Sequence, residues 1–349
     1  MATIATGSLD EAVVIDVRTP AEFERGHIPG AVNLPLFSNA ERAVVGTIYK
    51  KDGPEPALHK GLELVGPRMP ELARQAGLLI GQKKALVHCW RGGKRSASMA
   101  WLLAFCGHQV AVLEGGYKAY RRWAQATFAD DRWHFTVLGG RTGSGKTDIL
   151  HRLSEMGEQV IDLESLACHK GSAFGWIGEN PQPSAEQFQN LLYEALRRCD
   201  PDRRIWIENE SKCIGRVYLP DQFWARMKQA PLIHIEVPDK NRIDRLVRLY
   251  AGRSDISQLS TAFERIGKRL GGQHLKAALE ALEANDFHSA ARIALTYYDK
   301  TYDFNLRNNP SPSIHIVALE HPPGTVASCH EIITFADSHI GVYHAASGI

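Results

Sequence analysis

The chain has 349 residues, of which 44% are hydrophobic and 23% are charged, and its formal net charge is +2. This length allows two domains with a core each, and the nearly balanced charge neither requires nor excludes a nucleic-acid partner. Six scattered cysteines without a C-x-x-C pair argue against a zinc site or a disulfide framework and fit a reducing compartment. No stretch approaches the ~18 apolar residues that span a membrane, and residues 1–10 carry no secretory signal, so we expect a cytoplasmic protein.

The first part of the chain alternates between short apolar runs and stretches with the apolar spacing of a helix. Strands are expected over residues 12–16, 85–88 and 110–113, and helices over residues 96–105 and 117–129. This alternation predicts an α/β layer with a mainly parallel sheet. We place the end of this first domain at about residue 130.

A second α/β pattern begins at His134. Strands are expected over residues 135–138, 159–163, 204–208, 232–237 and 313–317, and helices from residue 146 and over residues 184–198 and 221–229. The pattern is mostly helical from about 240 to 302, and the signals are weak from residue 335. The predicted fold class is therefore α/β, with one domain at residues 1–130 and a second at residues 131–349.

Cys89 directly follows a predicted strand, and a loop rich in glycine and basic residues follows it. The loop consists of Trp90, Arg91, Gly92, Gly93, Lys94, Arg95 and Ser96. Backbone N–H groups in such a turn can form a nest for an anion, and the next helix N-terminus and the basic side chains favour a thiolate. We therefore expect Cys89 to be a nucleophile with a depressed pKa that acts on a persulfide donor, a selenium or sulfur oxyanion, or a phosphate.

The alternative for Cys89 is a buried residue at a strand end, and we keep that interpretation for the other five cysteines. His88 could tune the thiolate, but we expect it to pack on a strand face.

A second anion-binding loop follows the strand at residues 135–138. Gly140, Arg141, Thr142, Gly143, Ser144, Gly145, Lys146 and Thr147 form a complete G-x4-G-K-[ST] pattern between a strand and a helix. Its backbone N–H groups would wrap a diphosphate, Lys146 would reach the terminal phosphate, and the Thr147 hydroxyl could hold Mg²⁺. Nothing in the loop assigns the diphosphate to ATP, because any diphosphate ester would satisfy it.

Two carboxylates at the ends of predicted strands, Asp162 and Glu208, are candidates for the acidic residue that accompanies such a loop. Glu210 is a third candidate for the same neighbourhood. Asp162 and Glu208 could instead be solvated strand ends or helix caps.

Three arginines spaced by three residues share one side of a predicted helix. They are Arg242, Arg245 and Arg248. They could cover bound phosphates or contact an RNA backbone, or they could form a solvated basic face.

The first domain closely resembles the rhodanese-like sulfurtransferase domain. The resemblance rests on residues 16–23, residues 26–35, the Cys89 loop and residues 113–117. It implies that Cys89 accepts sulfur or selenium as a covalent persulfide or selenosulfide. It also implies mostly structural roles for Asp16, Arg18, Gly26, His27 and Pro29. The pattern His-Cys-x5-Arg-Ser of residues 88–96 also resembles the loop of cysteine phosphatases, so the loop alone leaves hydrolysis of a phosphate ester open.

A rhodanese-like domain ahead of a P-loop domain resembles the tRNA 2-selenouridine synthase family. Residues 162–175, residues 208–215 and residues 297–299 with Tyr302 extend the resemblance. The chain departs from the expected pattern at Lys170 and Lys212, which replace arginines, and at Asn209, which replaces a carboxylate. Charge is kept at the two lysines, whereas Asn209 weakens any role assigned to its position.

This resemblance implies a two-step reaction on 2-thiouridine at the wobble position of certain tRNAs. The sulfur is geranylated by geranyl diphosphate, and selenium from selenophosphate then replaces the S-geranyl group. Cys89 would carry the selenium, Arg95 and the amides of its loop would hold selenophosphate, and residues 140–147 would bind the diphosphate. Trp90 could stack on the splayed wobble base or pack in the core. The expected partners are tRNA and these two co-substrates, with no tightly bound cofactor.

Two other functions fit the two loops. A cysteine phosphatase fused to a P-loop kinase-like domain would turn over without RNA, and it needs a catalytic acid that the sequence does not identify. A sulfur carrier regulated by its P-loop would load a chalcogen on Cys89 but would modify no RNA unaided.

Overall fold

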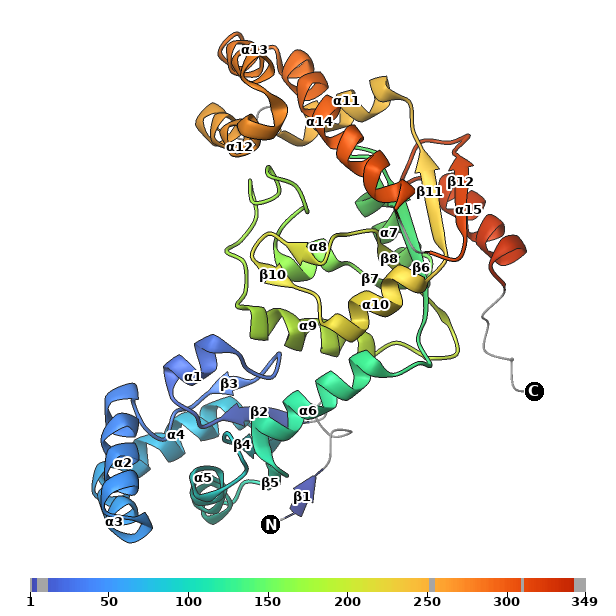
Figure 1. Cartoon of the computed structure of the whole chain (residues 1–349). Coiled ribbons are helices and arrows are strands. Elements are labelled where there is room, and N and C mark those ends of the chain that lie inside the picture. The colour runs from blue at the N-terminus through green and yellow to red at the C-terminus, as the bar shows by residue number, and fades with distance from the viewer. Residues whose placement is uncertain (1, 5–11, 251–254, 309–310, 342–349) are drawn as a thin grey trace, which may run out of the picture. The chain divides into compact units, whose positions relative to one another are not determined.

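The computed structural model describes residues 2–4, 12–250, 255–308 and 311–341 (Figure 1). The chain divides into two compact units. The first comprises residues 1–127 with residues 189–191, and the second comprises residues 128–188 with residues 192–349. Among the described residues, no helix is long and apolar enough to cross a membrane.

The first unit is built on a parallel sheet with the strand order β1-β5-β4-β2-β3. Its strands are β1 (Ala2–Ile4), β2 (Ala12–Asp16), β3 (Val32–Asn33), β4 (Lys84–His88) and β5 (Val110–Leu113). Its helices are α1 (Pro20–Arg25), α2 (Asn39–Lys51), α3 (Pro54–Val65), α4 (Met69–Ile80), α5 (Lys94–Phe105) and α6 (Gly116–Ala129), with a 3₁₀ turn at Gly66–Arg68. β4 is the middle strand, and Cys89 directly follows its last residue, so Cys89 lies at the carboxyl edge of the sheet. Parallel sheets place their ligand sites at this edge.

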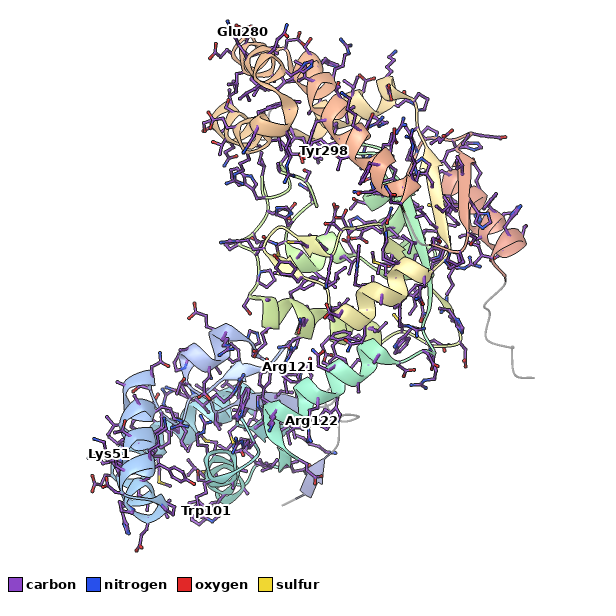
Figure 2. The ribbon with its side chains drawn as sticks, viewed as in Figure 1. Lys51, Trp101, Arg121, Arg122, Glu280 and Tyr298 are labelled. Atoms are coloured by element: carbon purple, nitrogen blue, oxygen red, sulfur yellow. The ribbon has the colours of Figure 1, made fainter. Side chains whose placement is uncertain are left out.

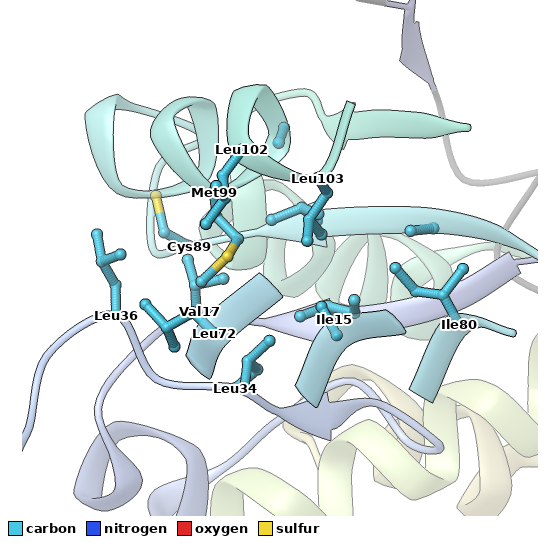
Figure 3. Packing of buried hydrophobic residues seen from close by; sticks show 14 of the residues in the cluster. Ile15, Val17, Leu34, Leu36, Leu72, Ile80, Cys89, Met99, Leu102 and Leu103 are labelled. Atoms are coloured by element: carbon cyan, nitrogen blue, oxygen red, sulfur yellow. The ribbon is translucent and has the colours of Figure 1, made fainter. Parts of the chain in front are cut away.

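Helices α4 and α5 pack on this sheet around a shared apolar core. Ile15 of β2, Leu72 of α4 and Met99 of α5 are among its buried members. Cys89 belongs to the same cluster, and Figure 3 shows it with Leu36 at one end. The core therefore fixes the carboxyl end of β4 and the start of α5 together.

The predicted strands β2, β4 and β5 and the predicted helices α5 and α6 are confirmed, although α5 begins at Lys94. Three helices between residues 39 and 80 were not predicted. Local signals for two of them are present. Ser38 and Glu41 form a capping box at the start of α2, and Pro54 occupies the first turn of α3.

The second unit contains a parallel sheet with the strand order β12-β11-β6-β8-β7. The strands are β6 (His134–Gly140), β7 (Gln159–Ile161), β8 (Arg204–Glu208), β11 (Leu232–Glu236) and β12 (Ile314–Ala318), and β9 (Cys213–Ile214) pairs with β10 (Val217–Tyr218) separately. The helices that alternate with them are α7 (Lys146–Glu155), α8 (Leu163–Ala167), α9 (Ala185–Arg197), α10 (Asp221–Gln229) and α15 (Val326–His339). β6 is the middle strand, so the loop after Gly140 also opens at the carboxyl edge of its sheet.

The helical region predicted from about 240 to 302 consists of α11 (Asp239–Tyr250), α12 (Ile256–Leu270), α13 (Gly272–Glu283) and α14 (Phe287–Arg307). Figure 1 shows α12, α13 and α14 gathered at one end of the second unit. They enclose an apolar core of their own, which includes Phe263, Leu282 and Ala294 and also takes in Phe174 from the loop after α8. This bundle is therefore attached to the sheet unit through α11, α14 and that loop.

One expectation for the second unit is corrected. The strand predicted over residues 159–163 ends at Ile161, because the Asp162 side chain caps helix α8 by accepting from the Ser165 N–H. The sequence signals are weak from residue 335, where the structure continues α15 to His339 and buries Ala336. Residues 342–349 lie outside the described part of the chain.

Candidate active site

The Cys89 loop is held in place by the start of helix α6. The N–H of Tyr117 donates to the Cys89 carbonyl at 2.9 Å, and the N–H of Lys118 donates to the Trp90 carbonyl at 2.9 Å. Gly116 has φ +60, and a Cβ there would lie 2.5 Å from the Gly92 nitrogen. Only glycine fits this position without moving the loop. The two-glycine turn after β5 thus packs directly against the Cys89 loop.

Cys89 is 3% exposed, and its Sγ lies 3.3 Å from the Ser96 hydroxyl oxygen. Burial raises the pKa of the Cys89 thiol, but hydrogen bonds outweigh this effect and lower the pKa below its ordinary value. They come from the Ser96 hydroxyl and from the backbone N–H groups of Arg91 and Ser96, and the Arg95 charge adds to them. The N-terminus of α5 favours the thiolate in the same sense.

Other cysteines lie in different surroundings. Burial raises the pKa of Cys199 to about 11, and it raises the pKa of Cys329 as well. The Cys89 neighbour His88 is fully buried, and burial lowers its pKa to about 4. His88 is therefore an uncharged packing residue at neutral pH and does not supply a cation to the thiolate.

Two residues of the loop have specific contacts besides Cys89. The Arg95 guanidinium makes an ion pair with the Glu22 carboxylate, with Nη1 to Oε2 at 2.7 Å. Trp90 is 37% exposed, and the centroid of its ring lies 5.7 Å from the centroid of the Tyr117 ring, with the two rings tilted. Arg91, Gly93 and Lys94 are exposed.

A buried ion pair supports the same edge of the sheet. Arg18 and Asp16 form a bidentate pair with Nη2 to Oδ2 at 2.6 Å, and both side chains are at most 1% exposed. Arg18 also donates to the Gly26 carbonyl at 2.7 Å and lies over the Tyr117 ring at 3.8 Å. These contacts tie β2, α1 and α6 together beneath the loop.

The second loop, residues 140–147, has the shape of a phosphate cradle. Gly143 and Gly145 have φ +82 and +84, and Lys146 begins helix α7. The Lys146 ammonium donates to the Gly140 carbonyl at 2.8 Å. Ser144 is 1% exposed, and its hydroxyl oxygen has no hydrogen-bond partner among the described residues. A helix N-terminus after a glycine-rich loop favours a bound anion, so phosphate binding at this loop stays a prediction.

Side chains of helices α11 and α14 form hydrogen bonds with the backbone of the phosphate loop. The Tyr302 hydroxyl accepts from the Gly140 N–H at 2.8 Å. Arg242 is 1% exposed, donates to the Thr142 carbonyl at 2.9 Å and is paired with Asp299. These contacts explain why residues 297–302 belong with the loop.

The three arginines of α11 have different environments. Arg242 is buried in the contacts above, so a solvated basic face is wrong for it. Arg245 is partly buried and ion-paired with Asp148, whereas Arg248 is exposed. Arg141 of the loop pairs with Asp303, with Nη2 to Oδ2 at 2.8 Å.

Carboxylates gather beside the phosphate loop. The Thr147 hydroxyl lies 3.5 Å from Glu164 Oε2, and the Glu164 N–H donates to Glu208 at 2.7 Å. Burial and the Glu210 charge raise the pKa of Glu164 to about 8. Burial, with Asp162 and Glu164 nearby, raises the pKa of Glu208, and burial raises that of Glu210.

Glu164 is therefore the carboxylate placed against Thr147, and sequence reasoning did not single it out. Its signal was its place in the family-specific segment that begins at Asp162. Asp162 itself accepts from the Ser165 N–H at 2.7 Å as a helix cap and contacts His151. Within the described residues, no group of three or more acidic, histidine or cysteine side chains has the arrangement of a metal site.

An apolar cavity of about 70 Å³ adjoins the phosphate loop in the second unit. Thr142 of the loop lies in its wall. The other lining residues come from the loop after α8 and from α11 to α14, among them Phe174, Leu246, Phe263, Leu295 and Tyr298. Figure 2 labels Tyr298 on α14. Nearly all of the surface that lines this cavity belongs to carbon atoms of aliphatic and aromatic side chains.

Comparison with known proteins assigns both units. Residues 4–122 match the model of the rhodanese-like domain, and residues 133–318 match the model of the tRNA 2-selenouridine synthase AAA domain. These matches confirm the predicted fold class, a rhodanese-like α/β domain followed by a P-loop-like α/β domain.

Curated relatives extend the match along the chain. A protein of Sulfurovum sp. named tRNA 2-selenouridine synthase is 36% identical over 336 residues, which cover 87% of this chain and 91% of the relative. Proteins of the same name from Nitrosomonas europaea and Hydrogenovibrio crunogenus are 38% and 35% identical, over 70% and 84% of this chain and 65% and 89% of their own lengths. The chain belongs to the tRNA 2-selenouridine synthase family.

Proposed function

We propose that this protein is an enzyme that replaces the sulfur of 2-thiouridine in tRNA with selenium, in two steps. A prenyl group from geranyl diphosphate is first transferred to the sulfur at the phosphate loop. Selenium from selenophosphate then replaces the S-geranyl group at Cys89. Family membership supports the overall conversion, and the chemistry of the two loops supports its division into steps.

The observation that carries the first step is the apolar cavity beside Thr142. A nucleotide would offer a polar base and ribose to the space next to the phosphate loop, and these groups need hydrogen-bond partners. A prenyl diphosphate offers a hydrocarbon chain to the same space. Because a chain of ten carbons needs more room than about 70 Å³, we expect α12 to α14 to move outward when it enters.

The residues of the loop fit the charged end of this substrate. The amides of residues 141–146 would bind the diphosphate, and Lys146 would leave the Gly140 carbonyl to pair with the terminal phosphate. The Thr147 hydroxyl could hold Mg²⁺, which would take its other ligands from phosphate oxygens and water. A bound ion would neutralise charge on the leaving diphosphate.

Alkylation of the thiocarbonyl releases a proton. The sulfur attacks C1 of the geranyl group, the C–O bond to diphosphate breaks, and N3 of the base loses its hydrogen as the thiocarbonyl becomes a thioether. We propose Glu164 as the acceptor of this proton. Its pKa of about 8 matches a base that works near neutral pH.

Electron balance limits the role of Cys89 in the second step. Attack of its thiolate on selenium would leave the bonding electrons on phosphorus, so it would release phosphite and need a reductant later. We therefore propose that Cys89 attacks C2 of the base and expels the geranyl thiolate. The selenium of selenophosphate then attacks C2 and expels Cys89, and water cleaves the Se–P bond to give phosphate. A cysteine of low pKa suits both attack and departure.

The phosphatase alternative needs a catalytic acid at this loop. Among the described residues, Glu22 contacts the loop through its ion pair with Arg95. Burial raises the pKa of Glu22, but hydrogen bonds from Arg95 and from the Thr19 N–H lower it below its ordinary value. Glu22 is therefore ionised at neutral pH and a poor proton donor for a leaving group.

The first step is tested by supplying 2-thiouridine tRNA with dimethylallyl, geranyl or farnesyl diphosphate, or with ATP as a competitor. We expect transfer from geranyl diphosphate and weak competition by ATP. Leu246→Asp, which places a charge in the apolar cavity, should raise the KM for geranyl diphosphate. Inhibition by ATP as strong as that by unlabelled geranyl diphosphate would contradict the proposal.

A further inference from the structure

A cavity much larger than an oxyanion needs opens beside Cys89, within the first unit. Its volume is about 1490 Å³, and α2, α3, the Cys89 loop and α5 contribute its walls. Small-molecule sites usually measure roughly 300–1,000 Å³. A selenophosphate ion would fill a small part of this space, so the cavity is suited to a larger ligand that meets Cys89.

The walls of the cavity carry apolar side chains that are exposed to solvent. They are Tyr49, Leu58, Leu62, Trp90 and Trp101. Leu58 and Leu62 are 41% and 60% exposed and lie one turn apart on α3, and Trp101 lies on α5 (Figure 2). Exposed apolar groups gathered in this way mark a binding surface.

The same cavity is lined by cations and by no acidic residue among the described side chains. The cations are Arg42, Lys50, Arg91, Lys94 and Arg95. Lys50, Arg91 and Lys94 are exposed. The cavity therefore combines hydrocarbon surface with positive charge, which suits a ligand that joins an apolar chain to phosphate groups.

We propose that this cavity binds the prenyl chain of the S-prenylated base while C2 of that base lies at Cys89. The inference rests on the proposed function, since that reaction brings such a base to the cysteine. The chain is attached to the sulfur that leaves C2, so it must lie within a few bonds of the Cys89 thiolate. Leu58, Leu62 and Trp101 would contact the chain, and Lys50, Arg91 and Lys94 would face phosphates of the RNA or of selenophosphate.

The cavity then selects the substrate of the second step. A base that still carries its bare sulfur has no chain to place there and would bind weakly. One extra or missing methylene group in a hydrophobic pocket changes substrate discrimination by roughly 10–200-fold. Selenium exchange should therefore favour the prenylated base, which makes the two steps sequential.

The test uses an anticodon stem-loop that already carries S-geranyl-2-thiouridine, and a matched RNA that carries S-methyl-2-thiouridine. The full chain and selenophosphate convert each RNA, and nucleoside mass spectrometry follows 2-selenouridine. Wild type should show a KM for the geranyl RNA at least tenfold below that for the methyl RNA.

Leu58→Gln/Leu62→Gln should raise the KM for the geranyl RNA at least tenfold and leave the KM for the methyl RNA unchanged. Leu78→Gln is the matched control, because Leu78 is 74% exposed on α4 and does not line the cavity. Equal KM values for the two RNAs with wild type would overturn the inference while leaving the proposed function intact. An equal loss on both RNAs in the double variant would overturn it too, by revealing a structural role. Conversion of neither RNA by wild type would refute the proposed second step and this inference with it.

Discussion

Among the hydrogen bonds that lower the pKa of the Cys89 thiol, the one with the Ser96 hydroxyl has the largest effect. This hydroxyl lies 3.3 Å from Cys89 Sγ and also donates to the Gly93 carbonyl at 3.0 Å. Because a hydroxyl has one hydrogen, Ser96 must release Gly93 to donate to a thiolate. A hydrogen bond to a charged group contributes about 1.5–3 kcal/mol, and a neutral one about 0.5–1.5 kcal/mol.

The net preference for the thiolate is then about 1 kcal/mol, which corresponds to somewhat less than one pKa unit at 1.36 kcal/mol per unit. Ser96→Ala should therefore raise the pKa of Cys89 by about 0.5–1 unit. The backbone N–H groups of Arg91 and Ser96 remain, so the pKa should not return fully to its ordinary value. Below the pKa, the rate of alkylation should fall about three- to tenfold at a fixed pH.

The assay is alkylation of the full chain by iodoacetamide across a pH series, with the Cys89 peptide followed by mass spectrometry. Ser98→Ala is the control, because the Ser98 hydroxyl donates to the Arg95 carbonyl on the same helix. The control should leave the Cys89 profile unchanged. A Ser96→Ala profile that coincides with wild type, or shifts to lower pH, would refute this account of the thiolate.

Further predictions concern the phosphate loop of the second unit. Tyr302→Phe removes the acceptor for the Gly140 N–H, so the Kd for geranyl diphosphate in calorimetry should rise several-fold. Alkylation of Cys89 should stay unchanged. An unchanged Kd would show that Tyr302 does not position the phosphate loop. Glu164→Gln should lower the single-turnover rate of prenyl transfer by about 10²–10⁴-fold. Binding of the diphosphate should weaken much less. A rate within threefold of wild type would exclude Glu164 as the proton acceptor. During selenium exchange, ³¹P NMR should show phosphate; phosphite would instead indicate attack of Cys89 on selenium.

The parts of the fold that the sequence predicted are those with local signals. Apolar runs such as residues 85–88 and 204–208 became the buried strands β4 and β8. The positions of the two anion-binding loops could also be predicted, because each loop directly follows a predicted strand. These features depend on the spacing of residues that are close together in the chain, and this spacing can be seen in the sequence.

Other parts depend on tertiary contacts that spacing does not reveal. Helix α3 leaves Leu58 and Leu62 exposed, so its apolar pattern does not mark one buried face. Arg242 looks like a surface cation in sequence, yet Asp299 and the Thr142 carbonyl make its burial possible. Glu164 of α8 and Thr147 of α7 lie 17 residues apart in the chain, and the tertiary fold brings their side chains to 3.5 Å.

The central claim is that the two loops perform successive steps on one base. Its most direct test is mass spectrometry of nucleosides from 2-thiouridine tRNA incubated with the protein, geranyl diphosphate and selenophosphate. Wild type should yield 2-selenouridine, Cys89→Ala should stop at the geranylated base, and Lys146→Ala should leave 2-thiouridine. Formation of 2-selenouridine by Cys89→Ala, or an unmodified tRNA with wild type, would contradict the account.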